Sequence, residues 1–143
     1  MQFMLILKAS EDSEAGVPPG KDLMEAMGRF NEEMVNAGVL LAGEGLQASS
    51  QGSRVQFSGG KTTVVDGPFS NIMDLIAGFW VIQVKSKEEA IEWARRCPAP
   101  HGEHQAAEIE IRKVFEASDF PPDVFSDEEA AREQALRDRL DRK

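Results

Sequence analysis

The sequence predicts a ferredoxin-like α+β fold, in which an antiparallel sheet carries helices on one face. Three observations lead to this prediction. The run from Phe3 to Leu7 is apolar without alternation, as in a strand buried on both faces. Apolar residues recur every three or four positions from Lys21 to Gly38, as in an amphipathic helix. The segment from Glu108 to Arg112 alternates apolar and charged residues, as in a strand with one exposed face.

The first half of the chain adds a loop, a strand and a hairpin. Residues 11–20 mix acids, a glycine and two prolines, which predicts an irregular loop before the first helix. A second strand follows at 39–42. Segments 54–57 and 62–65 alternate with the strand period, and the four residues between them, with two glycines, predict a hairpin turn.

The second half of the chain predicts a turn of helix, a strand, a helix and the final strand. One helical turn is expected at 71–75, before the longest apolar strand of the chain at 76–84. Ser86 stands three positions ahead of Glu89, which is the pattern of a reciprocal N-terminal cap, and Pro98 ends that helix. The order of elements is therefore β-α-β, hairpin, β-α-β.

A sheet whose central strands are apolar on both faces needs cover on both. The two predicted helices cover only one face. The simplest cover for the other is the sheet of a second copy related by a two-fold axis, so the sequence predicts a homodimer.

Composition limits the classes of function. A chain of 143 residues fits one domain. The 16 basic and 25 acidic residues give a net charge of −9, which disfavours direct nucleic-acid binding. Cys97 is the single cysteine and cannot form an internal disulfide, and no run approaches the roughly 18 apolar residues of a membrane helix. A soluble cytoplasmic protein without membrane contact is expected.

The composition changes after the Phe120-Pro121-Pro122 sequence. Ser126 precedes Glu129 by three positions, again the capping pattern, and a thin apolar stripe follows among many charges. We therefore expect a domain at residues 1–120 and a charged helical extension at 121–143.

The strongest candidate site follows the second strand of the hairpin. Two valines lead into Asp66, and the strand must stop there because Gly67 is flexible and Pro68 lacks an N–H. Asp66 at a sheet rim could act as a general acid or base if apolar neighbours desolvated it. Alternatively, its oxygens accept hydrogen bonds from the following turn.

The motif Asp66-Gly67-Pro68-Phe69, together with Ala42–Leu46 and Glu108–Arg112, resembles the YCII-related family, DGPF branch, over residues 1–120. The resemblance implies a dimeric α+β barrel. It also implies a catalytic His and Asp pair with the His in the first helix, but residues 21–37 contain no histidine. Only Asp66 carries over. The segment 70–74 also departs from the acidic and basic run that relatives tend to carry.

Further candidates surround this motif. Glu44 lies between two glycines after a strand, and its carboxylate could share a pocket with Asp66 or lie in a solvated loop. An arginine on the last strand could neutralise its carboxylates or bind an anionic substrate. Two histidines with Glu103 or Glu108 could supply metal ligands, although a solvated loop explains them as well, so no metal or cofactor is predicted. The expected ligand-binding residues are Glu44, Phe69, Phe79, Trp80, Glu110 and Arg112, and the histidines are His101 and His104.

Two main classes of function stay open, and a third possibility is an interaction protein whose barrel is only the core of a dimer. The first is a small-molecule enzyme of proton-transfer or lyase type centred on Asp66, which the resemblance supports because some relatives are enzymes. The second is a non-catalytic ligand-binding or regulatory module. The resemblance implies a link to transcription initiation by contact with sigma factors, because some relatives are fused to sigma-factor domains. The residues alone leave the choice between enzyme and module undecided.

Overall fold

The computed structural model describes residues 1–141. The chain divides into two compact units, Met1–Lys113 and Val114–Lys143. The first holds the sheet and all helices predicted for the domain, and the second holds the C-terminal extension.

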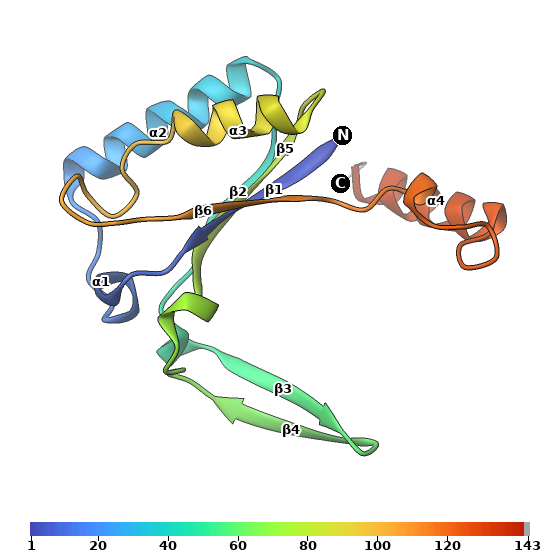
Figure 1. Cartoon of the computed structure of the whole chain (residues 1–143), viewed down its shortest axis with the longest axis horizontal. Coiled ribbons are helices and arrows are strands. Elements are labelled where there is room, and N and C mark those ends of the chain that lie inside the picture. The colour runs from blue at the N-terminus through green and yellow to red at the C-terminus, as the bar shows by residue number, and fades with distance from the viewer. Residues whose placement is uncertain (142–143) are drawn as a thin grey trace. The chain divides into compact units, whose positions relative to one another are not determined.

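The first unit has the predicted ferredoxin-like arrangement. Its sheet has the strand order β2-β5-β1-β6, with every neighbouring pair antiparallel. The strands are β1 (Gln2–Lys8), β2 (Leu40–Gly45), β5 (Ile76–Gln83) and β6 (Ile109–Lys113). Helices α2 (Lys21–Asn36) and α3 (Lys87–Arg95) lie on the same face of this sheet (Figure 1). The mixed α+β fold predicted from the periodicities is confirmed.

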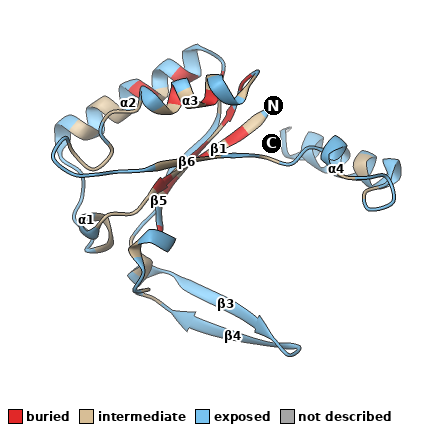
Figure 2. Cartoon of the chain, viewed as in Figure 1, coloured by how far each residue is buried: buried red, intermediate tan, exposed pale blue. Residues whose placement is uncertain are grey.

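The core lies between this face of the sheet and the two helices (Figure 2). Alternate residues of β1 are buried, because successive side chains of a strand point to opposite faces. Leu5 and Ile82 of the sheet and Met34 of α2 have no exposed surface. The other buried core residues are Phe3, Leu7, Phe30, Val39, Trp80, Val84, Ala90 and Trp93.

Within the unit Met1–Lys113, no helix lies on the opposite face of the sheet (Figure 1). Met4 and Ile6 alternate with the buried residues of β1, and they pair with Val81 and Phe79 of β5. Directly opposed residues of antiparallel strands share a face, so these four apolar side chains form one surface. All four are half-buried in the single chain. We call this surface the open face.

Strands β3 (Ser53–Ser58) and β4 (Lys61–Asp66) form the predicted hairpin. Gly59 and Gly60 take φ values of 59° and 77° at its tip, which is the left-handed conformation that a two-residue hairpin turn requires. The hairpin extends away from the sheet (Figure 1), and all residues of both strands are exposed. Its side chains therefore contribute little to the core.

The structure differs from the sequence prediction before α2. Residues predicted as an irregular loop include a short helix, α1 (Glu11–Glu14). Ser10 and Ser13 cap it reciprocally, since the Ser10 hydroxyl accepts from the Ser13 N–H and the Ser13 hydroxyl accepts from the Ser10 N–H. The capping pair was not recognised because the glycine and prolines that follow it favour a loop. The single turn predicted at 71–75 is present as the 3₁₀ turn η2 (Ile72–Asp74), and another, η1 (Ser49–Gln51), precedes the hairpin.

The second unit contains the 3₁₀ turn η3 (Ala117–Asp119) and the helix α4 (Asp127–Asp141). The Ser126 hydroxyl accepts from the Glu129 N–H at 3.2 Å, as the capping pattern predicts. No residue of α4 is buried. Among residues 1–141 no helix combines the length and apolar character needed to cross a membrane.

Candidate functional site

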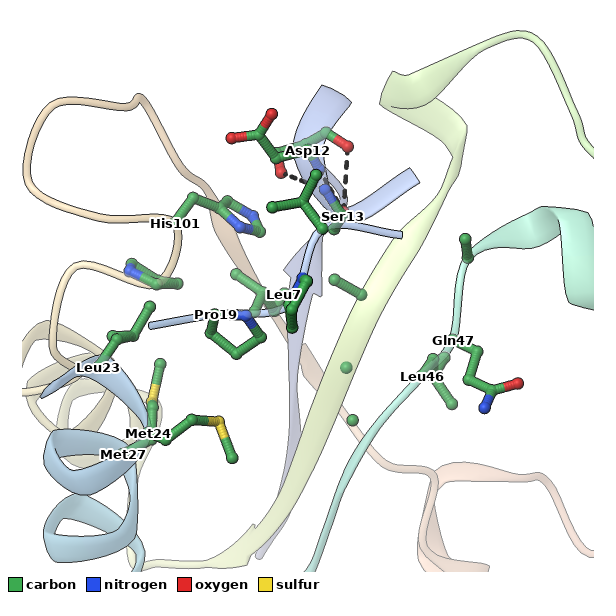
Figure 3. Close-up of a pocket in the computed structure, with 18 of the residues that line it drawn as sticks. Leu7, Asp12, Ser13, Pro19, Leu23, Met24, Met27, Leu46, Gln47 and His101 are labelled. Atoms are coloured by element: carbon green, nitrogen blue, oxygen red, sulfur yellow. Dashed lines mark hydrogen bonds between the residues drawn. The ribbon is translucent and has the colours of Figure 1, made fainter. Parts of the chain in front are cut away.

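A cavity of about 880 Å³ lies in the first unit, next to the start of α2. Three segments join α2 and β5 in forming it: the connection from β1 to α2, the chain after β2, and the loop after α3. A cavity of this size suits a small organic molecule. Figure 3 shows Leu23, Met24 and Met27 of α2 on one side and Leu46 and Gln47 on another.

The cavity has a mostly apolar lining. Trp80 forms part of its wall, and the Trp80 Nε1–H donates to Asn31 Oδ1 of α2 at 2.8 Å. Phe30 packs edge-on against Trp80, with ring centroids 5.8 Å apart. The indole is thus fixed from two sides, and the methionines of α2 add side chains that adapt to the shape of a ligand.

Three polar residues of the cavity lining lie on α1 and on the loop after α3. Asp12 accepts a hydrogen bond from Gln105 Nε2 at 2.8 Å, and the Ser13 hydroxyl is bonded to Ser10. Nε2 of His101 lies 2.8 Å from the backbone carbonyl of Lys8. The hydrogen bonds of Asp12 and of His101 each join residues 93 positions apart in the chain. They therefore hold the segment before α2 and the loop after α3 together at one rim of the cavity.

The Asp66-Gly67-Pro68-Phe69 turn holds another wall of the cavity in place. Gly67 N–H donates to the Gly52 carbonyl at 2.9 Å, and Phe69 N–H donates to the Ser49 hydroxyl at 3.0 Å. Ser49 in turn donates its N–H and hydroxyl to the carboxylate of Glu14. The residues on either side of Ser49 line the cavity. The turn therefore fixes the position of η1 against α1.

Asp66 itself lies at the base of the hairpin. Its Oδ1 accepts a hydrogen bond of 2.6 Å from the Ser53 hydroxyl across the strand pair. The side chain is exposed, and Asp66 is not among the lining residues of the cavity. Its acid–base role stays a prediction.

The other predicted ligand-binding residues fall into three places. Glu44, Phe79 and Trp80 belong to the strands that line the cavity, but the side chains of Glu44 and Phe79 point to the sheet face opposite to that of Trp80. Phe69 lies beneath the guanidinium of Arg54, 3.8 Å from ring centroid to Cζ. The remaining two, Glu110 and Arg112, belong to β6.

The sheet register brings some of these residues together. Glu44 pairs with Phe79, Phe79 pairs with Ile6, and Ile6 pairs with Glu110, so one row crosses the open face. Arg112 donates to Glu110 at 3.1 Å, and Lys8 Nζ lies 3.6 Å from the same carboxylate. The Arg112 hydrogen bond, assisted by the charge of Lys8, holds the pKa of Glu110 below its usual value. Arg112 and Lys8 thus neutralise Glu110 on this side of the sheet.

Cys97, His101 and His104 are the remaining candidates for a reactive or metal-binding role. Burial raises the pKa of the Cys97 thiol to about 11, which keeps the thiol protonated at neutral pH and poorly nucleophilic. His101 is bonded to a carbonyl, and His104 is exposed. Residues 1–141 contain no group of three His, Cys, Asp or Glu side chains arranged to hold a metal ion.

The sequence does not predict that Asp12, Ser13 and His101 lie in the cavity. Asp12 and Ser13 lie on a segment that the sequence predicts to be a loop, and the sequence suggests His101 only as a metal ligand. The capping pair Ser10 and Ser13 was a readable signal for α1. No sequence signal predicts that His101 meets the end of β1.

Comparison with known proteins decides the family. The YCII-related domain matches residues 1–118 of this chain. The chain belongs to the YCII-related family. It is similar to an uncharacterized protein of Rhizobium meliloti (strain 1021), with 24% identity over 99 residues, which are 69% of this chain and 80% of that protein. The match ends within η3, so the helix α4 lies outside the family domain.

Proposed function

We propose that this YCII-related protein is a homodimeric small-molecule enzyme of proton-transfer type that holds its substrate in the cavity beside Trp80. The cavity carries the proposal, because it combines an apolar lining with a few convergent polar groups, the usual character of a small-molecule site. Its Asp12 and His101 are the side chains able to exchange protons.

The open face supports the homodimer. Within Met1–Lys113, no layer covers the four half-buried apolar side chains on the central strands, and a two-fold axis would place the same surface of a second copy on them. We expect the protein to sediment at twice the chain mass of 15.8 kDa at micromolar concentration. Ile6→Glu would place an unpaired carboxylate in that interface and weaken dimerisation at least about tenfold.

The matched control for this experiment is Val35→Glu, because Val35 is 59% exposed on α2 and the helix packs on the other face of the sheet. This variant should remain dimeric. Circular dichroism of both variants checks that they are folded. A monomeric wild-type protein, or equal sedimentation of the two variants, would remove the homodimer from the proposal.

Asp66 is the residue proposed from the sequence as the proton-transfer group. In the single chain it is exposed, so this role requires cover supplied by a second copy. Asp66→Asn keeps the shape and the bond from Ser53 but removes the titratable group. If Asp66 transfers the proton, the variant should bind ligands found by a small-molecule screen with unchanged affinity but convert them at least about a hundredfold more slowly.

Equal turnover by wild type and Asp66→Asn would assign the proton transfer to the cavity residues instead. The structural role of Asp66 predicts the same result. If Asp66 only secures the base of the hairpin, the substitution changes neither binding nor turnover, since an amide oxygen can still accept from Ser53.

Two finer assignments belong to the same proposal. Membership of the DGPF branch is supported by the Asp66–Phe69 turn, which here organises the wall of the cavity. The regulatory alternative, contact with a sigma factor, is favoured by the exposed apolar side chains of the hairpin, which could meet a protein partner; Phe57 is 80% exposed and Val64 is 65% exposed. Capture of a sigma factor that is lost in Phe57→Ser would favour this alternative.

A further inference from the structure

The charges around the cavity limit what it can bind. Its lining contains the carboxylate of Asp12, and none of the lining residues that the structure describes is a lysine or arginine. The chain as a whole carries a net charge of −9. A carboxylate or phosphate ligand would lose hydration on entering and gain no cation in return.

Most polar side chains of the lining are already committed to the protein. Asn31 accepts from Trp80, Asp12 accepts from Gln105, and the Ser13 hydroxyl both donates to and accepts from Ser10. These groups shape the cavity and have less capacity left for a ligand. His101 keeps one ring nitrogen available for a ligand.

The hydrogen bond of His101 fixes which ring nitrogen carries the proton. A carbonyl oxygen can only accept, so Nε2 of His101 must donate to Lys8. In the neutral imidazole Nδ1 is then unprotonated and can only accept. Within residues 1–141 this nitrogen has no hydrogen-bond partner, and His101 lies at the rim beside Asp12 and Ser13 (Figure 3).

We propose that the cavity binds an apolar molecule, neutral or positively charged, whose N–H or O–H group donates to Nδ1 of His101. This inference rests on the proposed function, since it names the class of ligand for the same cavity. The apolar body of the ligand contacts Met24, Met27 and Trp80. Nδ1 of His101 orients it, and the carboxylate of Asp12 disfavours anions.

Three probes with the same ring test the proposal at neutral pH: 2-naphthol, 2-methoxynaphthalene and 2-naphthoate. The first carries an O–H donor, the second lacks it, and the third is an anion. Binding is followed by the NMR shift of the Trp80 indole N–H. Trp93 is the internal reference, because it is buried against the sheet and does not line the cavity.

We expect 2-naphthol to bind about three- to tenfold more tightly than 2-methoxynaphthalene, the range for one hydrogen bond. We expect 2-naphthoate to bind at least about tenfold more weakly than 2-naphthol. We expect His101→Phe to bind 2-naphthol and 2-methoxynaphthalene with about equal affinity. The ratio is the readout, because a general disturbance of the loop would weaken both neutral probes alike.

His104→Phe is the matched control, since His104 belongs to the same loop, is exposed and does not line the cavity. It should keep the wild-type ratio. A ratio that persists in His101→Phe, or equal binding of 2-naphthoate and 2-naphthol, would overturn this inference and leave the proposed cavity intact. Failure of all three probes to shift Trp80 would overturn the proposed function as well.

Discussion

Leu5→Ala is expected to lower the free energy of unfolding by about 3–4 kcal/mol. Leu5 has no exposed surface and lies on the central strand β1, opposite Trp80 on one side and Ile111 on the other. Removing its side chain loses the transfer free energy of the buried atoms and leaves a space that three strands and two helices cannot close. The loss should not depend on protein concentration.

The neighbouring residue Met4 supplies the control for this prediction. It is half-buried on the open face, so Met4→Ala should cost about 1 kcal/mol or less at concentrations where the protein is monomeric. If the homodimer forms, the cost should rise with protein concentration. Urea unfolding at two protein concentrations measures both effects. Equal losses for the two variants would contradict the assignment of Leu5 to the core and Met4 to the open face.

The fold was predictable because its information is local. The unbroken apolar run in β1 and the periodicity of α2 each specify an element and its buried face within a few residues. Alternation in β6 did the same, with Ile109 and Ile111 packed against the core. The short helix α1 was missed because its cap is a Ser–Ser pair followed by a glycine and prolines, whose turn signal is stronger.

The site was less predictable because long-range contacts create it. Trp80 lies in the cavity wall because β5 runs next to β1 in the sheet, and this strand order could be anticipated. His101 reaches the site through the carbonyl of Lys8, which is 93 positions away. Periodicity and motif spacing carry no information about such a contact.

The Asp66-Gly67-Pro68-Phe69 motif illustrates a different limit. The sequence marks it as important and suggests chemistry at Asp66, whereas the contacts in the single chain give the clearest role to the glycine. A side chain at Gly67 would place its Cβ 1.8 Å from the carbonyl oxygen of Ser49. That oxygen belongs to the backbone of η1, which lies in the wall of the cavity and cannot move as a side chain would.

Gly67→Ala is therefore expected to cost about 2–3 kcal/mol, because the new methyl group forces the hairpin base and η1 apart. The hydrogen bonds from Gly67 to Gly52 and from Phe69 to Ser49 should break with it. Urea unfolding measures the overall loss, and faster hydrogen exchange at the Gly67 and Phe69 amides locates it.

Gly52→Ala tests whether this effect is specific to Gly67, because Gly52 lies in the same contact. A Cβ on Gly52 would lie 3.6 Å from the Ser49 carbonyl oxygen, an ordinary contact distance, and the residue has an extended φ of −120°. This variant should change the stability by about 0.5 kcal/mol or less. If both alanine variants unfold at the same urea concentration as the wild type, the close packing of the motif against η1 is wrong. The wall of the cavity would then depend on the bond between Ser49 and Glu14 alone.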